Sequence, residues 1–291
     1  MRLSVLILTR DRRCDLIRSV AAVLPQLMPC DELLVLENGG SAACTGGLEE
    51  RFPAVTVRRS DTNLGVPGGR NLLAAGARGE VLVFIDDDAV ATPGLCDGLR
   101  RRFAADPELG VVALRIDDPK TGEPRSHEFP DRRKHMVDLV FQPTYFVGAG
   151  CAVRRQAFFA AGGFDASLFY SLEELDLSFR LAAHGARFLY DPELRVVHHA
   201  VGGGADGWLE RIVANRWRVP VRHLPAPMAA SHVLLWSGLL LWRALRHGKL
   251  AAWWAGLCSG VSGLPEALRE RRPLPREVIA RLRHAHGRLW F

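Results

Sequence analysis

The chain has 291 residues, of which 48% are hydrophobic and 24% charged, a composition typical of a folded protein and not of a disordered one. A chain of this length is expected to form one domain, or one domain with an appendage. The six cysteines are scattered and form no C-x-x-C pair, which argues against a zinc site or a disulfide framework and favours reduced thiols in the cytoplasm. The apolar run at the N-terminus is too short for a signal peptide, so we expect a buried strand there.

The net charge of +6 is unevenly distributed along the chain. Residues 205–291 contain 14 Lys and Arg against five Asp and Glu, a balance of +9, and they hold all seven tryptophans. Residues 1–204 contain 24 basic against 27 acidic side chains, a balance of −3. We therefore predict a region over 1–204 and a separate basic, Trp-rich helical region over 205–291. Because no recognition motif accompanies the basic charge, we expect no nucleic-acid partner.

Short apolar runs alternate with helical patterns over the first hundred residues. Strands are predicted at 3–8, 33–36, 55–57 and 81–85, with helices at 14–27 and 70–77 and a helix start at Thr92-Pro93. This alternation predicts an α/β fold with a mostly parallel, Rossmann-like sheet and flanking helices. Ligands of such sheets bind beyond the carboxyl ends of the strands. The polar groups that follow these strands are Thr9, Glu37, Asn63 and Asp86-Asp87-Asp88.

Three adjacent aspartates, Asp86, Asp87 and Asp88, come directly after the fourth strand. Their carboxylates repel one another, and a divalent cation with a preference for oxygen ligands would offset that repulsion. Such a cation can also bridge the two phosphates of a nucleotide, so the triplet predicts a metal and nucleotide site. The alternative is a solvated turn that begins a helix, where Asp is also common.

A second group of carboxylates lies at Glu173, Glu174 and Asp176. Ser171 is expected to cap a helix there, with Glu174 three positions later completing a capping box. Acidic residues in the first turn stabilise the helix dipole, which gives a purely structural interpretation. The functional interpretation is that one carboxylate accepts a proton from a substrate hydroxyl. The two interpretations are compatible.

Seven motifs, in this order, resemble those of family 2 glycosyltransferases with the GT-A fold, and most closely the bacterial rhamnosyltransferase-like branch. They are Thr9-Arg10-Asp11-Arg12, Glu37-Asn38-Gly39, Asn63-Leu64-Gly65 with Gly69-Arg70-Asn71, Asp86-Asp87-Asp88, Gly148-Ala149-Gly150, Gly162-Gly163-Phe164-Asp165 and Glu173-Glu174-Leu175-Asp176. The resemblance covers residues 1–204. It implies inverting transfer of a sugar from a UDP-, dTDP- or GDP-linked donor to an acceptor hydroxyl on a glycan, a lipid-linked saccharide or a natural product. Mg or Mn is the implied cofactor.

The resemblance also implies roles for individual residues. Asp88 is the implied metal ligand, and His198 is expected near the diphosphate and the metal, although His198-His199 could be a packed or surface pair. Glu174 stands where the family has its catalytic Asp, with Glu173 and Asp176 as alternative bases. The implied contacts to the nucleotide-sugar are Thr9, Arg10, Glu37, Asn63, Gly65, Arg70, Asp86, Asp87 and Gly150. Glu37 and Glu174 each replace the usual Asp by a residue one methylene longer.

Two segments of the basic region, 226–242 and 250–265, contain no charged residue. Both are shorter than the ~20 residues of a spanning helix. Two spans would also leave the basic linker 243–249 outside, against the positive-inside tendency. We therefore expect interfacial helices on an anionic membrane, peripheral on the inner face of the plasma membrane, with an amphipathic helix at 276–290. Packing on the first region, or a homodimer interface, are the alternatives. The tryptophans expected at headgroup level are Trp236, Trp242, Trp253 and Trp254.

Two other functions fit part of the pattern. A sugar nucleotidyltransferase shares the sheet and the metal–nucleotide chemistry, but the Gly-rich basic loop that it needs is absent after Leu8. A non-catalytic sugar-nucleotide-binding or scaffold protein would keep the aspartates but would not need the carboxylates at 173–176. Both considerations favour a glycosyltransferase.

Overall fold

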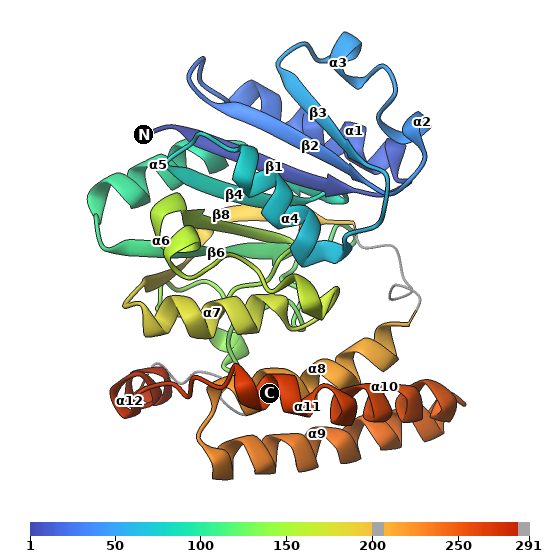
Figure 1. The fold of residues 1–291 in the computed structure, drawn as a ribbon. Coiled ribbons are helices and arrows are strands. Elements are labelled where there is room, and N and C mark those ends of the chain that lie inside the picture. Colours follow the sequence, from blue (N-terminus) through green and yellow to red (C-terminus); the bar gives the residue numbers. More distant parts are fainter. Residues whose placement is uncertain (200–206, 285–291) are drawn as a thin grey trace.

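A twisted sheet with helices on both faces forms the upper part of the molecule in Figure 1, and a layer of helices lies beneath it. The computed structural model describes residues 1–199 and 207–284. The strands are β1 (Leu3–Thr9), β2 (Glu32–Asn38), β3 (Val55–Ser60), β4 (Val81–Asp86), β5 (Ala89–Ala91), β6 (Leu109–Asp117), β7 (Gly150–Arg154) and β8 (Arg187–His198). The helices are α1 (Arg13–Val23), α2 (Ala42–Thr45), α3 (Leu48–Arg51), α4 (Gly65–Gly76), α5 (Leu95–Ala105), α6 (Arg155–Ala160), α7 (Glu173–Ala183), α8 (Trp208–His223), α9 (Ala226–Arg246), α10 (Leu250–Ser262), α11 (Leu264–Arg269) and α12 (Arg276–His284).

The strands form one eight-stranded sheet in the order β3-β2-β1-β4-β7-β6-β8-β5. Strands β1 to β4 pair in parallel, and so do β6 and β8, whereas β7 is antiparallel to both of its neighbours and β5 is antiparallel to β8. The predicted mostly parallel sheet with flanking helices is confirmed. Each of the four predicted strands is present, and each extends one to three residues beyond its predicted end or start.

The register of the parallel strands brings the predicted polar residues to one edge. Thr9 on β1 is paired with Glu37 on β2, and Leu8 is paired with Asp86 at the end of β4. Because the three strands run in the same direction, their carboxyl ends meet where the sequence places its polar groups. The sheet therefore provides the frame of the site.

Two apolar cores cover the two faces of the sheet. One lies under α1 and α5 and includes Leu16 and Phe103. The other lies under α4, α6 and α7, and it continues without interruption into the C-terminal helices. The C-terminal residues that belong to this second core include Val219, Leu224, Met228, Ala229, Leu274, Ile279 and Leu282. The basic region thus packs on the first region through α8, the start of α9 and α12, which is one of the two alternatives to membrane binding. Positions 285–290 of the predicted helix 276–290 lie outside the described residues.

Two helix starts differ from the sequence prediction. The capping box is wrong: α7 begins at Glu173, and the residue before it, Leu172, has a φ of 67° with no side-chain cap. Thr92 does not cap α5 either, because its hydroxyl donates to the carbonyl oxygen of Arg195 on β8 at 3.0 Å and the helix begins after Gly94. In both places contacts with distant parts of the chain replace the local cap.

Candidate active site

Buried side chains crowd the carboxyl ends of β1 and β4. The Thr9 hydroxyl donates to Asp87 Oδ2 at 2.7 Å, and Arg12 Nη1 lies 2.7 Å from Asp88 Oδ2 and 3.4 Å from Asp87 Oδ1. Burial, which outweighs the Thr9 hydrogen bond and the Arg12 charge, raises the pKa of Asp87 to about 7. The repulsion expected within the aspartate triplet is thus relieved in part by a basic side chain from the turn after β1.

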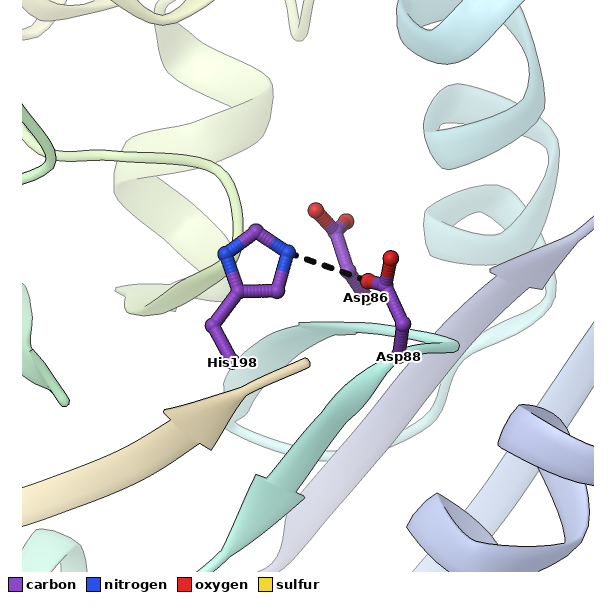
Figure 2. Close-up of side chains that lie close together, drawn as sticks. All are labelled: Asp86, Asp88 and His198. Atoms are coloured by element: carbon purple, nitrogen blue, oxygen red, sulfur yellow. Dashed lines mark hydrogen bonds and ion pairs between the residues drawn. The ribbon is translucent and has the colours of Figure 1, made fainter. Parts of the chain in front are cut away.

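Asp86, Asp88 and His198 point toward one another (Figure 2), and their ligand atoms all lie within 4.8 Å of one another. His198 Nε2 is 3.1 Å from Asp88 Oδ1, and its Nδ1 is 2.8 Å from Glu128 Oε1. Burial opposes a charged imidazole, but the hydrogen bonds to Asp88 and Glu128 raise the pKa of His198 to about 10. Burial would raise the pKa of Asp88, but His198 and Arg12 hold it below its usual value.

Carboxylate oxygens with one imidazole nitrogen form a ligand set that suits Mn²⁺ and related divalent cations. Glu128 contacts the ring nitrogen that a metal would leave free, which is the usual arrangement for orienting a histidine ligand. The residues present therefore fit the predicted metal. Asp86, which the resemblance assigns to contacts with the nucleotide-sugar, also belongs to this group.

Arg70 on α4 is a buried cation that joins the two carboxylate groups. Its Nη2 donates to Asp86 Oδ1 and to the Gly148 carbonyl oxygen, each at 2.8 Å. Its Nη1 lies 3.7 Å from Glu174 Oε1 and 3.9 Å from Glu173 Oε1. The surrounding carboxylates raise the pKa of the guanidinium despite its burial, so Arg70 carries a permanent positive charge at the centre of the site.

The two glutamates at the start of α7 differ in environment. Glu174 has a side chain that is 22% exposed and accepts a hydrogen bond from the Gly148 amide at 3.1 Å, whereas the Glu173 side chain is only 3% exposed. A Cβ at position 148 would lie 2.4 Å from both Arg70 Nη1 and Glu174 Oε1, so a larger residue there would displace these two side chains from their present positions. Burial, together with the neighbouring Glu174, raises the pKa of Glu173 to about 8, and burial also raises the pKa of Glu174.

A cavity of about 430 Å³ connects these groups. Five predicted site residues line it: Arg70, Asp86, Glu173, Glu174 and His198. Sequence reasoning missed the lining residues that come from loops and from the C-terminal region, which include His127, Glu128, Tyr145, Tyr170, Trp208, Ile212 and Arg216. No periodic pattern marks the first four of these residues. The sequence places Trp208 only within the basic, Trp-rich region. Helix α8 therefore forms one wall of the candidate site.

The turn that precedes α7 is held in an unusual conformation. Phe169, Ser171 and Leu172 have φ values of 58°, 76° and 67°, in the left-handed region that non-glycine residues rarely adopt. Asn215 on α8 is buried, and its Nδ2 lies 3.1, 3.0 and 2.8 Å from the carbonyl oxygens of Leu168, Tyr170 and Ser171. Backbone strain of this kind persists only where the surroundings hold it, and here α8 holds it beside the glutamates.

Glu37 is the most isolated of the predicted site residues. Its side chain is almost completely buried, and neither carboxylate oxygen has a hydrogen-bond partner among the described residues. Burial, and after it the proximity of the Glu37 carboxylate, raises the pKa of the nearby Cys44 thiol to about 11. A buried carboxylate without donors is costly, so this position fits a ligand that supplies N–H groups.

Nine predicted residues do not line the cavity: Thr9, Glu37, Asp87 and Asp88, described above, and five others. Arg10 is exposed, and Asn63 Oδ1 accepts from the Gly65 amide at 2.9 Å, so it holds the loop before α4. Gly65 packs on the Phe169 backbone, and Gly150 packs within the sheet on Val196. Asp176 is buried on the far side of α7, where its carboxylate meets His223 Nε2 at 2.7 Å and Arg180 Nε at 3.0 Å. Asp176 therefore anchors α8 and is not placed to serve as a base.

Known proteins with related sequences support this interpretation of the site. A family model described as Glycosyl transferase family 2 matches residues 4–163. The O-antigen biosynthesis protein RfbC of Myxococcus xanthus is 27% identical and covers 75% of this chain, although the chain spans only 19% of that protein. The N-acetylglucosaminyl-diphospho-decaprenol L-rhamnosyltransferase of Mycobacterium tuberculosis is 24% identical, with 88% of this chain and 89% of that protein covered. These relatives support the rhamnosyltransferase-like branch.

Solved structures show the same fold at low identity. GalNAc-T7 with UDP, GalNAc and Mn2+ has a TM-score of 0.58 and 17% identity, covering 70% of this chain and 44% of that chain. The mannosyltransferase PcManGT from Pyrobaculum calidifontis, with GDP-Man and Mn2+, has a TM-score of 0.58 and 18% identity, covering 98% of this chain and 75% of that chain. The family match extends over more than half of the sequence, so the chain belongs to glycosyl transferase family 2 and is a nucleotide-sugar glycosyltransferase with the GT-A fold.

Proposed function

We propose that this glycosyltransferase is an inverting enzyme that depends on Mg or Mn, with Asp86, Asp88 and His198 as the metal-binding group and Glu174 as the base. One observation carries the proposal: Asp86 and His198 of the metal-binding group line the same cavity as Glu174, Asp88 contacts His198, and Arg70 lies between Asp86 and Glu174. A bound cation would neutralise charge on the leaving nucleotide diphosphate. The structural neighbours that were solved with Mn2+ support this cofactor choice.

The residues of the chain would carry out proton transfer and position the reacting groups. Glu174 accepts the proton of the acceptor hydroxyl, whose oxygen attacks the anomeric carbon from the face opposite the diphosphate. The bond from this oxygen to the anomeric carbon forms as the sugar–phosphate bond breaks, and the electron pair of the broken bond leaves with the diphosphate. Because attack and departure occur on opposite faces, the configuration at the anomeric carbon inverts. The Gly148 amide and Arg70 hold the Glu174 carboxylate in place. Such fixed positioning lowers the entropic part of the barrier.

The donor is proposed to be a UDP-, dTDP- or GDP-linked sugar. Uracil, thymine and guanine each present a ring N–H, which the buried acceptor atoms of Glu37 would receive. The acceptor is proposed to be a saccharide of the bacterial cell envelope, since the relatives are named for O-antigen biosynthesis and for rhamnosyl transfer to a lipid-linked sugar. Thr9, at the neighbouring strand end, would complete the base site.

A thermal-shift screen of UDP-, dTDP- and GDP-sugars, with and without Mn, tests the donor and the metal together. We expect one donor class to raise the melting temperature only when metal is present, because ligands that bind the folded state alone stabilise it. Asp88→Asn should remove the metal-dependent part of the shift, whereas Asp97→Asn, an exposed residue on α5, should not. Equal stabilisation of wild type with Mn and with EDTA would contradict the metal assignment.

A further inference from the structure

Exposed apolar side chains are concentrated in one short part of the chain. Of the 15 large hydrophobic residues that are exposed in the described structure, nine lie between positions 234 and 268. They are Leu234, Leu235, Leu239, Trp242, Leu245, Leu250, Trp254, Val261 and Leu268. Single exposed apolar residues are common on soluble proteins, but a concentration of this kind marks an interaction surface.

The exposed residues follow one side of each helix. Leu235, Leu239 and Trp242 recur at helical spacing along α9, as Leu250 and Trp254 do at the start of α10. The opposite sides of these helices are already occupied, since Leu240 and Ala244 are buried against α8 and α10 in a small separate core. The Trp253 indole also donates to the Ser237 carbonyl oxygen at 3.2 Å and ties the two helices together. We call the exposed residues from 234 to 254 the α9–α10 face.

The charged residues of α9, of α10 and of the turn between them are all basic. Between positions 226 and 262 the chain contains Arg243, Arg246 and Lys249 but no Asp or Glu. All three basic residues are exposed at the turn between the helices, and the Arg246 guanidinium lies 4.8 Å from the centre of the Trp242 ring. Apolar and aromatic side chains edged by basic ones are the pattern of helices that lie in the interface of an anionic membrane.

Insertion of α9 across a bilayer is a different arrangement, and the packing opposes it. In the part of the chain that the structure describes, α9 is the one helix that is long and apolar enough to span a membrane, judged by length and composition alone. It has 21 residues and continues past the uncharged segment 226–242. However, Met228 and Ala229 belong to the core under the sheet, and buried His232 lies 3.4 Å from Arg216. Spanning would remove these contacts, whereas surface binding leaves them intact.

We propose that the α9–α10 face seats the protein on an anionic lipid bilayer, with its leucines and tryptophans at the boundary between headgroups and acyl chains. The occupant is a lipid surface and not a second copy of the chain, because the basic edge has no acidic counterpart on the face itself. A second copy of the face offers no carboxylate to pair with these basic residues, whereas an anionic headgroup does. The proposal does not depend on the assigned catalytic residues.

Co-sedimentation of the full chain with vesicles tests this directly. We expect at least about tenfold stronger partitioning onto vesicles of phosphatidylglycerol and phosphatidylcholine than onto phosphatidylcholine alone, and weaker binding as salt rises. The triple variant Leu235→Gln, Leu239→Gln, Trp242→Gln should reduce partitioning by about tenfold or more. The matched control Leu139→Gln, Val140→Gln, Phe159→Gln removes three similarly exposed apolar side chains elsewhere and should bind as wild type does. Unchanged melting temperatures would show that both triples fold.

Three results would overturn the proposal. Wild-type protein that stays in solution with anionic vesicles would refute it, and so would equal loss of binding in the control triple. Sedimentation velocity supplies the third. If the wild-type protein is a dimer that does not bind vesicles, and the triple variant of the α9–α10 face is a monomer, the face joins two copies of the chain. Because binding is measured without donor or metal, failure here leaves the catalytic proposal untouched.

Discussion

At the scale of single residues, Glu173 and Glu174 show how packing distinguishes chemically identical neighbours. Both line the cavity, but Glu174 is the more exposed and is oriented by the Gly148 amide, while Glu173 is enclosed. A general base must reach the hydroxyl that it deprotonates, so accessibility favours Glu174. Its raised pKa also brings its basicity closer to what proton abstraction near neutral pH requires.

Replacement of Glu174 by Gln separates its chemistry from its geometry. The amide oxygen of Gln can still accept the Gly148 hydrogen bond, but the side chain cannot take up a proton. We expect kcat for sugar transfer to fall by about a hundred- to ten-thousand-fold, with donor affinity in calorimetry unchanged within about twofold. Glu174→Ala should lose activity to a similar extent. A variant that keeps more than a tenth of wild-type kcat would show that another group is the base.

The pH dependence of kcat/KM tests which of the two glutamates titrates as the base. Because burial raises the pKa of Glu174, the ionised base should be lost as pH falls through values above the ordinary 4.5 of a glutamate. Glu173, whose pKa is raised to about 8, is already protonated over that range. Glu173→Gln should therefore leave the acidic limb at the same pH and retain the maximum rate. An acidic limb that moves to lower pH in this variant would show that Glu173 is charged there.

Part of the candidate site could be predicted from sequence and part could not. Asp86, Glu174 and His198 follow strands or begin a helix within recognisable motifs, and the structure brings all three to the cavity. Glu128 and Trp208 carry no local signal, since their positions depend on contacts across the fold. Asp176 lies in the predicted motif but faces the other side of α7, because residues two positions apart on a helix do not share a face.

At the scale of elements, the start of α7 is set by another helix. Sequence predicts the strands well because their apolar runs are buried on both faces of a parallel sheet. It fails at Ser171 and Leu172, where Asn215 and not a local cap fixes the backbone. Asn215 on α8 holds the strained turn, so the position of the two glutamates that follow it depends on a helix outside the region of family resemblance.

Asn215→Ala should therefore impair catalysis from a distance. Loss of its amide removes a hydrogen-bond donor from the carbonyl oxygens of Tyr170 and Ser171, and we expect a stability loss of about 1–3 kcal/mol. We also expect kcat to fall by at least about tenfold with the donor KM nearly unchanged, since the turn positions Glu174 but not the metal-binding group. Gln26→Ala, which removes an amide hydrogen bonded to Ala22 at 2.9 Å on the other face of the sheet, is the matched control. A similar fall in kcat in that control would assign the effect to general destabilisation.

At the scale of the whole molecule, the predicted boundary near residue 204 separates two compositions but not two cores. Val219 and Met228 lie in the same apolar core as Leu177 beneath the sheet. Ion pairs reinforce the junction, with Arg222 on α8 contacting Asp165 of the Gly-Gly-Phe-Asp motif. Composition revealed the change in surface chemistry, but it could not reveal which apolar side chains would face inward across the boundary.

A shared core predicts cooperative unfolding of both regions. All seven tryptophans lie in residues 205–291, so their fluorescence reports that region alone. The buried thiols Cys44, Cys96 and Cys151 lie in the sheet region, so their labelling reports the other. In urea the two signals should give the same midpoint, as two-state unfolding requires. Separate midpoints would show that the regions are independent domains.

The continuity of that core has a consequence for synthesis on the ribosome. A chain emerges N-terminus first, and the strands of the sheet are complete by His198. The apolar core under α4, α6 and α7 is nevertheless incomplete until Ile279 and Leu282 have emerged. The half-finished protein must therefore keep part of this core uncovered during the translation of some eighty further residues, and chaperones that shield such surfaces would act in that interval.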